Sequence, residues 1–121
     1  MAKLKYFVLQ YMPNIQSGEF LNVGLVLLDV SSPVSGFCGV RFAPKWEVRV
    51  QSWDSNADIS TLRALFGEIE NKLSDPGQRG EMLRLMEDSF SNAICLSPWQ
   101  DCPGQDATQE VERLASTYLG V

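Results

Sequence analysis

The sequence contains no histidine, only three cysteines and no long apolar run. Histidine is the commonest general base and the commonest ligand of transition metals, so its absence disfavours most nucleophile–base pairs and most metal sites. The longest aliphatic run covers residues 25–28, which is far too short to cross a bilayer. The motifs G-x-S-x-G, G-x-G-x-x-G, Walker A and paired C-x-x-C do not occur. These absences favour a binding protein over an enzyme, with no metal site and no cofactor.

We also expect no secretory leader. The basic N-terminus precedes an apolar run at 6–9, but that run is broken by Gln10 and Pro13 and no small-residue cleavage site follows. We therefore expect a cytoplasmic protein of the bacterial type that does not bind membranes. In that compartment the three cysteines are expected to be free, buried thiols rather than a disulfide.

Dense basic clusters are absent as well. The net charge is −5, and residues 1–53 carry five basic and three acidic side chains, whereas residues 54–121 carry five basic and twelve acidic ones. A phosphate backbone attracts clustered lysine and arginine, so nucleic-acid binding is disfavoured. The acidic half is either a solvated helical surface or a docking face for a basic partner.

What is present suits a single domain spanning residues 1–121. Alternating or continuous apolar residues with aromatic and β-branched content predict strands over 3–11, 19–30, 37–42 and 92–97. Helical spacing predicts helices that begin at Asp58, near Gln78 and at Asp106, and residues 98–104 are read as a loop. Asp106 and Gln109 have the spacing of a capping box. We therefore expect an α+β fold in which an antiparallel meander of three to five strands packs with about three helices.

Two features leave alternatives open. Apolar residues alternate with polar ones over 46–51, which predicts a further edge strand, with a short helical turn as the competing interpretation. The three tryptophans, Trp46, Trp53 and Trp99, lie outside the main apolar periodicities. Such residues either cover a small core or form the centre of an interface.

Tyr11-Met12-Pro13 is followed by Gly18-Glu19-Phe20-Leu21-Asn22-Val23-Gly24 and a run of aliphatic residues. This segment resembles a small bacterial family catalogued as domain of unknown function 3037, and weaker similarity extends over nearly the whole chain. The resemblance implies no activity. It implies a genomic neighbourhood that often contains HipA-type kinases, and hence an accessory or antidote-like partner of a HipA-like kinase. A homo-oligomer is also compatible with it.

The same segment supplies the candidate binding residues, Tyr11, Glu19 and Asn22. In a binding role, Glu19 and Asn22 would line an accessible surface near Tyr11. In a structural role, Asn22 would bond the backbone of the loop before residue 18, and Glu19 would pair with a lysine or arginine. A glycine within a strand, such as Gly24, indicates a bulge or a close approach of the backbone.

The alternative hypothesis is a metal-dependent, nuclease-like enzyme. It would use Asp29 at the end of one strand and Glu47 on a later one to hold Mg²⁺, with Arg49 stabilising the developing negative charge. The spacing is permissive, and arginine stands where such motifs prefer lysine.

Overall fold

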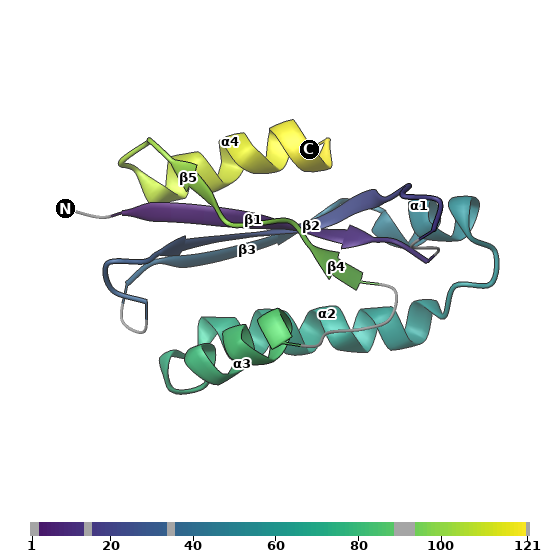
Figure 1. Cartoon of the computed structure of the whole chain (residues 1–121), viewed down its shortest axis with the longest axis horizontal. Coiled ribbons are helices and arrows are strands. Elements are labelled where there is room, and N and C mark those ends of the chain that lie inside the picture. Colours follow the sequence, from purple (N-terminus) through teal and green to yellow (C-terminus); the bar gives the residue numbers. More distant parts are fainter. Residues whose placement is uncertain (1–2, 14–15, 34–35, 89–93, 121) are drawn as a thin grey trace.

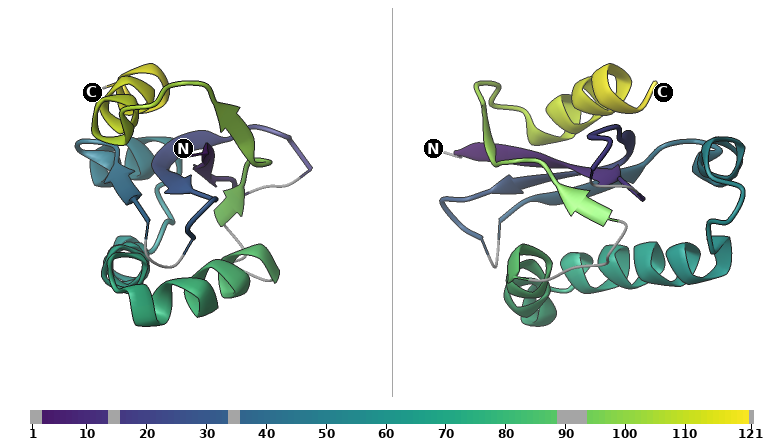
Figure 2. Two further views of the ribbon diagram at one scale, coloured as in Figure 1. Left: turned by 90° about the vertical axis from the view of Figure 1, so that its left-hand side faces the viewer. Right: turned by 45° about the vertical axis from the view of Figure 1, so that its right-hand side comes forward.

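Two long apolar segments form the centre of a five-stranded antiparallel sheet with helices on both faces (Figures 1 and 2). The computed structural model describes residues 3–13, 16–33, 36–88 and 94–120. In chain order the elements are β1 (Leu4–Tyr11), β2 (Leu21–Asp29), β3 (Cys38–Phe42), α1 (Trp46–Trp53), α2 (Ile59–Ser74), α3 (Pro76–Asp88), β4 (Ile94–Leu96), β5 (Gln100–Cys102) and α4 (Ala107–Leu119). The α+β fold is therefore confirmed, with four helices where about three were expected.

The first three strands form the expected meander, in the order β3-β2-β1. The other edge of β1 is shared by two short strands: β4 pairs with its second half, where Leu9 faces Leu96, and β5 pairs with its first half, where Leu4 faces Cys102. Between them Ser97 keeps the ladder closed, because its N–H donates to the Val8 carbonyl and its Oγ accepts the Val8 N–H at 2.8 Å. The first strand of the chain is thus an inner strand of the sheet.

Each face of the sheet is covered by helices. In Figure 1, α4 lies on one face and α2 and α3 lie on the other. Residues 25–28 of β2 are all buried, at 0–3% exposure, so this strand is covered on both faces. No helix in the described ranges is long and apolar enough to cross a membrane.

Side-chain caps fix where two of these helices begin. The Asp58 carboxylate accepts the Thr61 N–H at 3.1 Å and starts α2, and the Asp106 carboxylate accepts the Gln109 N–H at 3.2 Å and starts α4. Such caps satisfy backbone donors that have no partner within the helix. Buried stripes at helical spacing then face the sheet: Leu62, Phe66, Ile69 and Leu73 in α2, and Val111, Leu114, Ala115 and Leu119 in α4.

Residues 46–51 form a helix, so the predicted edge strand is wrong. Trp46 and Val50, four residues apart, are buried on one face of α1, whereas Val48 is 65% exposed. Alternation over only three apolar positions also fits a helix, because positions i and i+4 share a helical face. The centroids of the Trp46 indole and the Phe66 ring of α2 are 4.7 Å apart, and this contact favours the helical conformation of residues 46–51.

Residues 98–104 are not all loop, because 100–102 form β5. The strand is short and its first two residues are exposed, so the sequence carries no apolar alternation there. Residues 89–93, which include the end of the second predicted helix and the start of the predicted strand over 92–97, lie outside the described ranges. The cysteines at 38, 95 and 102 are free thiols, with only Cys102 fully buried.

A bulge and a close approach occur where the glycine in β2 suggested them. The pairing of β1 with β2 shifts register between Leu9, which faces Gly24, and Gln10, which faces Asn22. A Cβ on Gly24 would lie 2.8 Å from a methyl carbon of Leu9. The extra residue is Val23, so the bulge follows Asn22 and does not lie between Glu19 and Asn22.

Candidate functional site

The loop before β2 and the helix α1 meet at one end of the sheet and leave an open hollow there. Its volume is about 650 Å³, within the range of ligand and side-chain pockets. The lining residues are Gly18, Glu19, Phe20, Leu21, Arg49, Ser52 and Trp53. Phe20 is 49% exposed and Trp53 is 41% exposed. We call this the larger hollow, and its aromatic side chains remain accessible to a partner.

A smaller hollow of about 370 Å³ adjoins it and shares two of its lining residues. It is lined by Pro13, Ser17, Glu19, Trp53 and Asp54. Because Glu19 and Trp53 line both hollows, the two lie next to each other on the surface. We refer to the two hollows together as the aromatic site.

A buried tyrosine supports this site from beneath. The Tyr11 hydroxyl donates to Oδ2 of Asp54 at 2.7 Å, and the Tyr11 ring meets the Trp53 indole edge-on with centroids 6.3 Å apart. Burial, followed by this hydrogen bond, raises the pKa of Tyr11 to about 12, so the hydroxyl keeps its proton at neutral pH. Oδ1 of Asp54 accepts the Asn56 N–H at 3.1 Å. The Asp54 carboxylate is therefore held in a fixed orientation at the end of α1.

The last turn of α4 is fastened beside the same site. The Asn22 amide donates to the Tyr118 carbonyl at 3.3 Å, and an Arg49 guanidinium N–H donates to the Leu119 carbonyl at 3.4 Å. The final carbonyls of a helix have no partner within it, and a cation near that end is favourable. Asn22 and Arg49 thus satisfy the end of α4, and Gly120 closes the helix with φ 70°.

The structure places one of the three candidate residues in the lining of the aromatic site and a second next to it. Glu19 lines both hollows, whereas Tyr11 lines neither but contacts the lining residues Asp54 and Trp53. Asn22 is turned toward α4 instead, and its Oδ1 accepts from the Gln10 amide at 3.4 Å. Its backbone partner is in α4 and not in the loop before residue 18, which corrects that part of the structural interpretation. Within the described ranges Glu19 forms no ion pair, so the expected pairing with lysine or arginine is not found.

The residues of the nuclease hypothesis do not meet. Asp29 ends β2 beside the start of β1, whereas Glu47 and Arg49 are on α1 at the opposite end of the sheet (Figure 1). Asp29 accepts from the Ser31 hydroxyl, which lowers the pKa of Asp29, and Glu47 lies 3.6 Å from the Arg63 guanidinium. The described residues hold no group of three or more Cys, Asp or Glu side chains placed to bind a metal ion.

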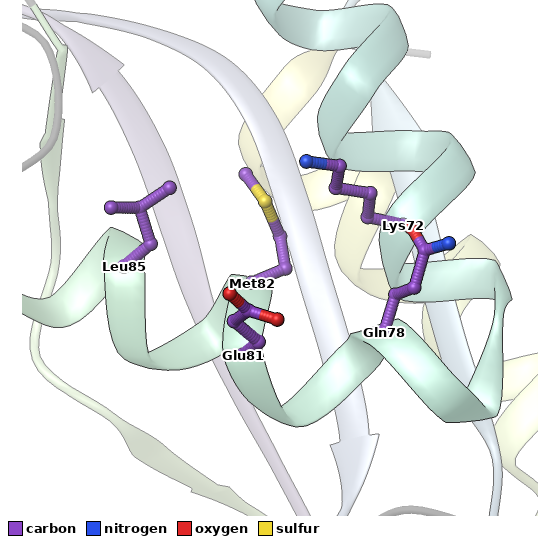
Figure 3. Close-up of a pocket in the computed structure, with 5 residues that line it drawn as sticks. All are labelled: Lys72, Gln78, Glu81, Met82 and Leu85. Carbon is purple, nitrogen blue, oxygen red and sulfur yellow. The ribbon is translucent and has the colours of Figure 1, made fainter.

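A further hollow of about 430 Å³ lies between α2 and α3. Figure 3 shows its lining, with Lys72 from α2 and the other four residues, Gln78, Glu81, Met82 and Leu85, from α3. The Lys72 ammonium is already paired with Glu68 at 2.7 Å, as expected for residues four apart on a helix, and none of the described residues that line the hollow is aromatic. Interface centres are enriched in aromatic residues and arginine, so the aromatic site is the stronger candidate.

The tryptophans divide between the two roles that the sequence left open. Trp46 is buried in the core. Trp99 packs against the core, with its ring edge-on to Phe7 and the two ring centroids 4.7 Å apart. Trp53 alone among them belongs to the aromatic site. Phe20 and Asp54 were not identified from the sequence. The signal for Phe20 was its apolar side chain in a polar turn directly before β2, and for Asp54 there was none.

The fold and the site define a small α+β protein with an open aromatic hollow at one end of its sheet. By sequence, the family model described as protein of unknown function (DUF3037) matches residues 6–119. The chain belongs to this family, which is the one that the segment at 11–27 resembles. No curated protein and no solved structure matches the chain.

Proposed function

We propose that this protein is a non-catalytic accessory protein that binds another protein through the aromatic site, and that its partner is a HipA-like kinase. The observation that carries the proposal is the pair of exposed aromatic side chains, Phe20 and Trp53, over the larger hollow. Exposed apolar side chains grouped around a concavity mark interaction surfaces. The kinase as partner rests on the genomic neighbourhood that the family resemblance implies.

The composition of the site suits protein recognition. Tryptophan and arginine, two of the residue types most enriched at the centres of interfaces, are both present as Trp53 and Arg49. Both side chains are held by contacts within the protein, because Arg49 is bonded to the end of α4 and Trp53 packs on the buried Tyr11 ring. A preformed surface loses little conformational entropy when a partner binds.

The test is binding of a purified HipA-like kinase from the same genome, measured by calorimetry. Wild type is expected to bind, and Phe20→Ala and Trp53→Ala are each expected to weaken binding by roughly tenfold or more, as for residues at the centre of an interface. Leu85→Ala is the matched control, because Leu85 is also exposed, at 53%, but lies on α3 away from α1. Its binding should equal that of wild type.

Thermal denaturation of each variant separates lost contact from lost folding. Phe20 is half exposed, so Phe20→Ala should melt close to wild type. The proposal is overturned if the kinase does not bind, or if it binds both alanine variants as tightly as wild type. Phosphorylation assays on the complex then distinguish an antidote, which lowers kinase activity, from an accessory subunit, which leaves it unchanged.

A further inference from the structure

The charges of the aromatic site are divided between its two hollows. Of the lining residues, Arg49 belongs only to the larger hollow and Asp54 only to the smaller one, while Glu19 belongs to both. Among the described residues, the smaller hollow is therefore lined by two carboxylates and by no lysine or arginine. Trp53 lines it as well.

This combination is suited to a cation. A guanidinium or ammonium group over a tryptophan face is attracted by the ring quadrupole, and neighbouring carboxylates add Coulomb attraction and hydrogen bonds. The Trp53 indole is 41% exposed, so part of its surface is open to a ligand. The Glu19 carboxylate has no ion-pair partner among the described residues.

The second carboxylate is held in place for such a contact. The Tyr11 hydroxyl and the Asn56 N–H each occupy one lone pair of the Asp54 carboxylate, on different oxygens. A carboxylate has about four acceptor positions, so two remain. Tyr11 is thus a positioning residue that holds Asp54 from the buried side.

We infer that the smaller hollow receives an arginine or lysine side chain of the partner protein, next to an apolar side chain of the same partner in the larger hollow. This inference rests on the proposed function and adds the chemistry of the partner's contact segment. The larger hollow supplies the apolar half, because Phe20, Leu21 and Trp53 line it. Since the two hollows share Glu19 and Trp53, neighbouring side chains of one segment reach both.

The site is first tested without the kinase. The probe is N-acetyl-arginine methylamide, and its control is N-acetyl-citrulline methylamide, which has nearly the same shape but no charge. Both are titrated while the indole N–H resonance of Trp53 is followed by NMR. The arginine compound is expected to shift this resonance and the citrulline compound is not. Equal shifts with the two compounds, or none with either, would overturn the inference.

The kinase complex provides the second arm. Glu19→Gln and Asp54→Asn each remove one charge and keep the shape, and each is expected to weaken kinase binding about two- to fivefold, as for exposed ion pairs. They should also flatten the dependence of affinity on salt, because screened charge pairs are lost. Glu70→Gln, at an exposed position on α2, is the matched control and should leave both quantities unchanged.

The outcomes separate the two proposals. Kinase binding that needs Phe20 and Trp53 but is unaffected by Glu19→Gln and Asp54→Asn overturns the cation site and keeps the proposed function. A Trp53 shift that is specific for the arginine probe, together with no kinase binding, supports the cation site and overturns the kinase as partner.

Discussion

Arg79 on α3 ties the turn between β2 and β3 to the end of α2, and its removal gives the sharpest test of the fold. The side chain is only 5% exposed. Its Nε donates to the Leu73 carbonyl at 2.7 Å, and one terminal nitrogen donates to the Pro33 and Gly36 carbonyls at 3.3 and 2.9 Å. Hydrogen bonds from a charged donor contribute about 1.5–3 kcal/mol each and do not add fully.

Arg79→Met is therefore expected to lower the free energy of unfolding by about 3–5 kcal/mol, because one buried and two partly buried hydrogen bonds are lost at once. With a urea slope of about 2 kcal/mol per molar, the denaturation midpoint should fall by about 2 M. Arg79→Lys keeps the charge but not the planar array of donors, so it should lose an intermediate amount. Arg84→Met, at an exposed position on the same helix, is the control and should change stability by less than about 0.5 kcal/mol. A loss below about 1 kcal/mol for Arg79→Met would refute this reasoning.

Four further substitutions test the site and its support. The pKa of Tyr11 is about 12 in the folded protein and ordinarily 10.0, so the stability that the protonated hydroxyl contributes is complete below pH 10 and is lost between pH 10 and 12. Tyr11→Phe should reduce this loss of stability at high pH, as measured by urea denaturation. A pH profile of stability equal to that of wild type would contradict the prediction. Asn22→Ala should lower the free energy of unfolding by about 1 kcal/mol, because a carbonyl of α4 loses its donor, whereas Glu19→Ala should lower it by less than about 0.5 kcal/mol. Equal melting temperatures for the two variants would argue against the structural role of Asn22. Gly24→Ala should lower the free energy of unfolding by about 1–3 kcal/mol, because the new Cβ would lie 2.8 Å from a Leu9 methyl carbon. A melting temperature equal to that of wild type would show that the packing around Gly24 is loose.

Local signals made most of the fold predictable. Asp58 and Asp106 bond the first turns of α2 and α4, as their sequence positions indicated. Segments that depend on distant partners were misread. Trp46 could be assigned to a helix only through its contact with Phe66, and 100–102 is a strand only because β1 lies beside it. Short elements are decided by tertiary contacts, and a single sequence does not display those contacts.

The candidate site was predictable in part for the same reason. Glu19 and Tyr11 belong to one recognisable segment; the structure places Glu19 in the lining of the aromatic site and Tyr11 in contact with Asp54 and Trp53. Trp53 and Asp54 come from α1 and its end, more than 30 positions along the chain, and nothing local linked them to that segment. Asn22 shares the segment but not the site, because the strand turns its side chain toward α4.

The sharing of one edge of β1 by β4 and β5 has a consequence for synthesis of the chain. Residues 4–11 are synthesised well before their partners at 94–102. At about 5–20 residues per second, roughly 4–17 seconds separate the two events. During that interval an apolar strand keeps an open edge, which other chains can pair with. We therefore expect that a chain truncated before residue 94 leaves this edge of β1 unpaired and aggregates more readily than the full chain.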